Sequence, residues 1–120
     1  MKKIIKSFGF AIRGIKIVFG TETNMKIHLV ITAIVIIGGT ALSINKTEWI
    51  FCVLCIGLVI GSEMLNTSIE NIVDLVSPEQ HPLAGKAKDI AAGAVLFCAI
   101  CSVIVGIIIF LPKILAVLYV

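Results

Sequence analysis

Residues 63–74 read EMLNTSIENIVD and follow directly on an uncharged apolar run, residues 49–61, WIFCVLCIGLVIG. No Gly or Pro interrupts residues 62–76, so the sequence predicts one helix that continues from the apolar run into the acidic stretch. Ionisable groups at the end of a membrane-length segment are costly and are usually functional. We therefore interpret the acidic stretch as a candidate site.

The acidic stretch is predicted to carry its polar residues on one face. At 100° of rotation per residue, four polar side chains fall within an arc of about 80° and along ~16 Å of helix: Glu63, Asn66, Glu70 and Asp74, with Thr67 beside them. The opposite side is predicted to be the packed face and carries Leu65, Ile69, Ile72 and Val76. The alternative is an amphipathic extension into water whose acids are simply solvated.

The composition places the chain in a lipid bilayer. Hydrophobic residues make up 59% of its 120 residues and the mean hydropathy is +1.15, which is more apolar surface than a soluble domain of this size can bury. The predicted fold class is therefore an all-α membrane protein with a single domain. The basic N-terminal segment has no uninterrupted apolar core and no small-residue cleavage site, so we expect no signal peptide.

Three transmembrane helices are predicted within the single domain, at residues 26–44, 48–75 and 87–120, the second with a cytoplasmic extension. Ahead of them, residues 1–25 place apolar side chains at helical spacing and basic side chains mostly on another face. This pattern is typical of an amphipathic helix that lies on an anionic membrane surface. A merely solvated, basic N-terminus is the alternative.

Basic residues are distributed unevenly around the predicted spans. Lys86 and Lys88 precede the third span, and the loop between the first two spans carries only Lys46. The residues up to the start of the first span include Lys2, Lys3, Lys6, Arg13, Lys16 and Lys26. The positive-inside rule then predicts a cytoplasmic N-terminus, a cytoplasmic acidic stretch and a C-terminus outside.

Several carboxylates at one membrane boundary can hold a divalent cation. Mg²⁺ typically uses one or two carboxylates together with substrate phosphates. Lys86 and Lys88 would supply charge for phosphate, while Asp89 either shares in this site or only favours the dipole at the start of the third span. The sequence has no GxxxxGK[ST] loop and no HRD or DFG set, so any kinase here must be of another kind than the soluble ones.

Four segments occur in the order and spacing of one known family: FGFAIRGIK, TETNMKIHL, EMLNTSIENIVD and GKAKDIAAGAV. By these motifs the chain closely resembles the prokaryotic diacylglycerol kinase family, small integral-membrane lipid kinases, over nearly its whole length. The segments IHL at 27–29, HPLAGKAKDIAAGAV at 81–95 and GIIIFLPK at 106–113 look most like the undecaprenol kinase branch.

The resemblance implies an N-terminal surface helix, three transmembrane helices and a homotrimeric bundle in the bacterial inner membrane. It implies transfer of the γ-phosphoryl group of MgATP to a lipid hydroxyl at the cytoplasmic interface. The branch implies undecaprenol as the acceptor, giving undecaprenyl phosphate, and diacylglycerol, giving phosphatidic acid, is the alternative. The expected partners are ATP, the lipid alcohol, the bilayer and further copies of the chain, with no nucleic acid.

The resemblance also implies roles for individual residues. Glu63 looks like the general base that takes the hydroxyl proton, and Glu22 and Glu70 look like the Mg²⁺-binding pair. Asn66 and Asp74 match supporting positions. The residues expected to contact ATP are Glu22, Glu70, Glu79, Gln80, His81, Lys88 and Asp89. Ser68 stands where the commonest family pattern has Ala.

Three residues have simpler interpretations without the resemblance. Glu22 would be an interfacial acid that pairs with Lys26, and His81, which precedes Pro82, would be a solvated loop residue. We interpret His28 as a snorkelling interfacial residue rather than an acid or base.

The competing function is a small oligomeric cation channel lined by the acids of residues 63–74. A pore needs polar positions through the bilayer depth, whereas residues 49–61 are almost wholly apolar, which argues against a channel. A third hypothesis is a non-catalytic membrane scaffold, for which the acidic and basic set would have no purpose.

Two CxxC pairs, Cys52 with Cys55 and Cys98 with Cys101, would suggest zinc or redox chemistry in a soluble protein. Both pairs lie inside apolar spans. We therefore interpret these cysteines as small apolar residues that pack between helices.

Overall fold

The computed structural model describes residues 1–120, and all of its regular secondary structure is helical. The helices are α1 (Lys2–Thr21), α2 (Thr23–Ala41), α3 (Lys46–Val76) and α4 (Pro82–Leu118). The prediction of an all-α fold is confirmed.

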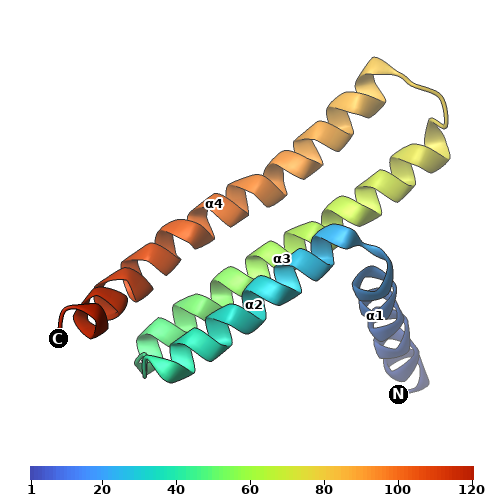
Figure 1. Cartoon of the computed structure of the whole chain (residues 1–120). Coiled ribbons are helices and arrows are strands. Elements are labelled where there is room, and N and C mark those ends of the chain that lie inside the picture. The colour runs from blue at the N-terminus through green and yellow to red at the C-terminus, as the bar shows by residue number, and fades with distance from the viewer.

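Helices α3 and α4 form a long antiparallel hairpin, and α2 lies along the first half of α3 (Figure 1). Helix α1 leaves the start of α2 at a steep angle and points away from the hairpin (Figure 1). The second half of α3 extends past the start of α2 together with the first half of α4 (Figure 1). The acidic stretch therefore lies where the three-helix bundle gives way to a two-helix hairpin.

Helices α2, α3 and α4 are each long and apolar enough to cross a membrane. Only 11 of the 120 residues are buried, while large apolar side chains such as Ile37, Leu58 and Phe97 are exposed. Hydrocarbon accepts such a surface and water does not. The predicted number of spans is confirmed, and the chain is a membrane protein.

Helix α3 is continuous from the apolar run through the acidic stretch, as predicted. Asn45 starts it with a capping box, because its side chain accepts from the backbone N–H of Glu48 and the Glu48 carboxylate accepts from the N–H of Asn45. Its 31 residues extend ~46 Å, which exceeds the ~30 Å thickness of a hydrocarbon core. Helix α3 can therefore reach from the bilayer interior into water.

Two ion pairs join α3 to α4 at opposite ends of the hairpin. Lys113 Nζ lies 3.2 Å from Glu48 Oε1 at one end, and Lys88 pairs with Asp74 at the other. The Glu48 carboxylate is 20% exposed and the Asp74 carboxylate is 63% exposed. Solvent therefore screens the Asp74–Lys88 pair more than the Glu48–Lys113 pair.

The structure corrects the predicted faces of the acidic stretch. The side predicted to be packed is open, since Leu65 and Val76 are 67% and 77% exposed. The polar side is buried instead, with Glu63, Asn66 and Thr67 at 2%, 5% and 5% exposure. The reason is that an apolar side chain gains little by leaving lipid for protein, whereas a polar group must be withdrawn from hydrocarbon.

Candidate active site

Glu63 is the most deeply buried ionisable residue of the acidic stretch. It lies on α3 opposite the start of α2, where His28 Nε2 is 3.7 Å from Glu63 Oε2. The His28 side chain is 16% exposed and the Glu63 side chain is 3% exposed. This separation is an ion-pair distance rather than a hydrogen bond, and the Glu63 carboxylate has no other polar side-chain partner. It is thus a buried acid with unused hydrogen-bonding capacity.

Asn66 and Glu70 are joined one turn further along α3. Asn66 Nδ2 donates to Glu70 Oε1 at 3.3 Å, which orients one carboxylate oxygen and leaves the other unengaged. Asn66 Oδ1 and Thr67 Oγ1 are buried and have no hydrogen-bond partner. Buried polar atoms are rarely left unpaired, so these two oxygens indicate a place where a ligand or water completes the site.

Two cavities adjoin at His28 and Ala99, and Glu63 lines one of them. The first, here called the polar pocket, has a volume of about 260 Å³, and its polar lining comes from Asn24, His28, Glu63 and Asn66. The second, here called the apolar groove, is also about 260 Å³ and runs between α2, α3 and α4 among mostly hydrophobic side chains. His28 and Ala99 line both. A molecule with a hydrocarbon chain and a polar head could therefore place one end in each cavity.

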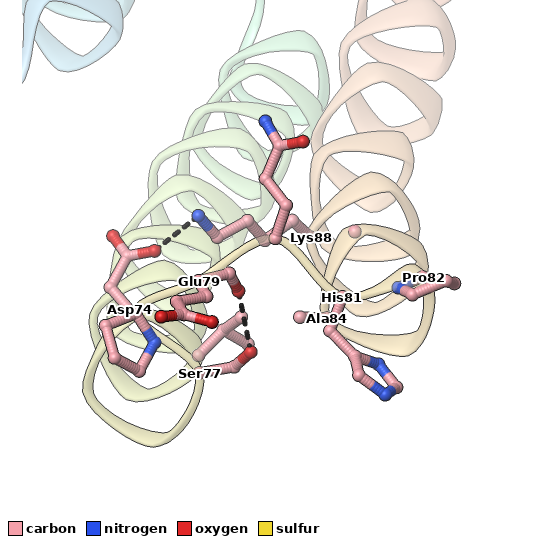
Figure 2. A pocket seen from close by; sticks show the side chains of 11 residues that line it. Asp74, Ser77, Glu79, His81, Pro82, Ala84 and Lys88 are labelled. Atoms are coloured by element: carbon pink, nitrogen blue, oxygen red, sulfur yellow. Dashed lines mark hydrogen bonds and ion pairs between the residues drawn. The ribbon is translucent and has the colours of Figure 1, made fainter.

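The loop between α3 and α4 frames a larger cavity of about 580 Å³, here called the loop cavity (Figure 2). Asp74 and Lys88 form their ion pair at its side, and the Ser77 hydroxyl donates to the Glu79 carbonyl at 3.0 Å (Figure 2). Its lining includes the predicted site residues Asp74, Glu79, Gln80, His81 and Lys88. The structure thus brings most of the predicted ATP contacts together.

His81 begins α4. Its ring turns away from the Asp74–Lys88 pair (Figure 2), and Nδ1 accepts a hydrogen bond from the Leu83 N–H at 3.1 Å. His81 is thereby the N-cap, with Pro82 at the first helical position. Asp89 consequently lies beyond the first turn of α4, where it is exposed, so its interpretation as a residue at the helix start is wrong.

Glu22 lies at the junction of α1 and α2, where its extended backbone (φ −92°, ψ 121°) separates the two helices. Its side chain is half-buried and makes no hydrogen bond or ion pair, so the ion pair with Lys26 considered above is not formed. No three His, Cys, Asp or Glu side chains converge closely enough to hold a metal ion. A Mg²⁺ site completed by phosphate oxygens needs only one or two carboxylates, and the unengaged oxygen of Glu70 fits that donor set.

The sequence interpretation did not pair His28 with Glu63 and did not predict that Thr67 is buried. His28 faces Glu63 because α2 packs antiparallel to α3, and no spacing within one segment reports such a pairing. Thr67 shares a helical face with Glu63, so its burial follows once that face is known to point inward.

Comparison with known proteins gives a consistent result. The family model for Prokaryotic diacylglycerol kinase matches residues 9–110. Undecaprenol kinase of Bacillus subtilis (strain 168) is 43% identical over 113 residues, covering 94% of this chain and 92% of that protein.

Relatives named diacylglycerol kinase are also similar. The Synechocystis protein is 40% identical over 114 residues, covering 94% of this chain and 65% of that protein. The Escherichia coli (strain K12) protein is 29% identical over 102 residues, covering 85% of this chain and 84% of that protein.

The burial of Glu63 predicts a cost in stability. Glu63→Met should raise the free energy of unfolding by ~0.5–2 kcal/mol, because an apolar side chain of similar size removes the desolvation penalty of a buried carboxylate that accepts no hydrogen bond from a side chain. Denaturant unfolding in detergent micelles measures this change. The exposed Glu79 provides the control, since Glu79→Met should change the free energy by less than ~0.5 kcal/mol. A Glu63→Met protein less stable than wild type would contradict the expectation.

Proposed function

The chain belongs to the prokaryotic diacylglycerol kinase family, and we propose on that basis that it transfers the γ-phosphoryl group of ATP to the hydroxyl of undecaprenol. The observation that carries this proposal is the buried carboxylate of Glu63, which lines the polar pocket, next to the apolar groove that shares His28 and Ala99 with that pocket. A lipid alcohol has a hydrocarbon chain for the groove and a hydroxyl for the carboxylate.

The acceptor is proposed from similarity. Identity to an undecaprenol kinase over nearly the whole chain supports undecaprenol, with undecaprenyl phosphate as the product. Diacylglycerol, with phosphatidic acid as the product, is the second candidate because several relatives are named diacylglycerol kinase.

Glu63 is proposed as the general base. Its carboxylate takes the hydroxyl proton while the hydroxyl oxygen forms a bond to the γ-phosphorus and the bond from that phosphorus to the β–γ bridging oxygen breaks, releasing ADP. Burial of Glu63 supports this role, because low exposure to water strengthens the electrostatic interactions of the carboxylate with the reacting atoms. Phosphoryl transfer otherwise depends on positioning of the substrates and neutralisation of phosphate charge more than on covalent catalysis.

Glu22 and Glu70 are proposed to hold Mg²⁺, and Asn66 and Asp74 to support the site. Bound Mg²⁺ would neutralise phosphate charge. Asn66 supports the role of Glu70 by fixing one of its carboxylate oxygens. In the loop cavity, Lys88 would exchange its Asp74 partner for a phosphate oxygen. The remaining proposed ATP contacts are Glu79, Gln80, His81 and Asp89.

The protein is proposed to lie in the bacterial inner membrane, with its N-terminus and site cytoplasmic and its C-terminus outside. The distribution of basic residues supports this orientation. Helix α1 is proposed to lie on the membrane surface, since Ile5 and Phe8 are 67% and 65% exposed and basic residues stand among them. A homotrimer is proposed because three thin helices cannot alone enclose both ATP and a lipid.

Lipid phosphorylation tests the proposed function. Purified protein in mixed micelles with radiolabelled ATP and Mg²⁺ should phosphorylate undecaprenol with a kcat/KM at least about tenfold above that for diacylglycerol. A preference for diacylglycerol would replace undecaprenol as the acceptor. Absence of any labelled lipid, together with cation flux in proteoliposomes that lack nucleotide, would overturn the kinase in favour of a channel.

The metal assignment has its own test. Glu70→Gln and Glu22→Gln should each raise the Mg²⁺ concentration for half-maximal phosphorylation by about tenfold or more, because each removes an anionic oxygen ligand. Glu48→Gln, at the far end of the hairpin, is the matched control and should leave the Mg²⁺ titration unchanged. Superimposable titrations for all of these variants would refute the assignment.

A further inference from the structure

His28 makes the one ion-pair contact of the carboxylate that we assign as the base. Its Nε2 faces one oxygen of that carboxylate, Oε2 of Glu63, at 3.7 Å. No Lys or Arg lines the polar pocket or the apolar groove, so His28 is the one group there that can carry positive charge. His28 is therefore the one cationic group that is placed to attract the Glu63 carboxylate.

The other polar side chains around His28 make no hydrogen bond to it or to Glu63: in the polar pocket these are Asn24 and Asn66, and Asn66 donates to Glu70 instead. Helix α4 faces the polar pocket with Ala92, Val95, Leu96 and Ala99, none of which can hydrogen-bond through its side chain. On the groove side, the polar groups are the thiols of Cys52 and Cys55 and the hydroxyls of Thr32 and Ser102. The Thr32 and Ser102 hydroxyls both donate to backbone carbonyls within their own helices. Glu63 is consequently the only carboxylate that faces the imidazole.

The position of His28 between the cavities links it to the lipid. His28 lines both the polar pocket and the apolar groove, and the only other residue that does so is Ala99. A lipid whose chain lies in the groove and whose hydroxyl reaches Glu63 would lie beside the imidazole. A group at this point can fix both the carboxylate and the approach of the hydroxyl.

We propose that His28 is a positioning residue for phosphoryl transfer, an inference that rests on the proposed function. In this role the imidazole carries a hydrogen on Nε2 and attracts Oε2 of Glu63 across 3.7 Å, so that Oε1 is left to take the hydroxyl proton. His28 forms and breaks no bond to the lipid or to ATP. The interpretation of His28 as a snorkelling interfacial residue is replaced by this role.

The test is a kinetic comparison of His28 variants in the undecaprenol assay. His28→Leu should lower kcat by about 10- to 100-fold and leave the KM for MgATP unchanged, because a misplaced base slows the transfer without altering nucleotide binding. His28→Gln places an amide N–H near the position of Nε2 and should recover most of the rate. Val30→Leu, at an exposed position of the same helix, is the matched control and should match wild type.

A double-mutant cycle separates positioning from general damage. In a Glu63→Asp background the shorter carboxylate no longer reaches the imidazole, so His28→Leu should cost less than threefold there. Thermal unfolding midpoints verify that each variant folds, and His28→Asn replaces His28→Leu if the latter does not.

The proposal is overturned by a His28→Leu kcat within twofold of wild type, by a loss confined to the KM for MgATP, or by equal losses in both backgrounds. A His28→Gln protein as slow as His28→Leu would also overturn it. Failure of the wild-type protein to phosphorylate any lipid alcohol would instead refute the proposed function, so the two failures are distinguishable.

Discussion

The withdrawal of one carboxylate from lipid is the constraint on which the rest of the structure depends. A charged group in hydrocarbon is costly unless a protein partner or a polar cavity receives it. Glu63 meets this requirement by facing inward, toward His28 and the polar pocket, while the apolar side of the same helix faces out. The packing of α2 against α3 and α4 thus encloses the site as well as building the bundle.

The exposure of the site carboxylates increases along α3 from the lipid end to the water end. Glu63 is buried, Glu70 is half-buried, and Asp74 is exposed and paired with Lys88 on α4. This order matches the substrates, since a lipid hydroxyl arrives from the bilayer and a nucleotide arrives from water. The length of α3 makes the gradient possible, because one rigid helix carries all three carboxylates through the interface.

Much of this organisation could be predicted from the sequence, and the exceptions have physical causes. Hydropathy and the unbroken run after Trp49 predicted the spans and the continuous α3, because both are properties of a single segment. The face that α3 buries was predicted wrongly, since rules for soluble helices invert in lipid. The partner of Glu63 could not be predicted, because His28 meets it only through tertiary packing. The capping of α4 by His81 was likewise not predicted, because the sequence analysis placed Asp89 at the start of this helix.

We propose that Glu63 takes the proton of the lipid hydroxyl. The rate of undecaprenol phosphorylation by the Glu63→Gln protein tests this role most directly. The amide keeps the size of the side chain but cannot accept the proton as a carboxylate does, so kcat should fall by about 10²- to 10⁴-fold. Glu48→Gln, which alters a carboxylate at the opposite end of the hairpin, should retain the wild-type rate. A folded Glu63→Gln protein with full Mg²⁺-dependent activity would contradict the assignment of Glu63 as the base.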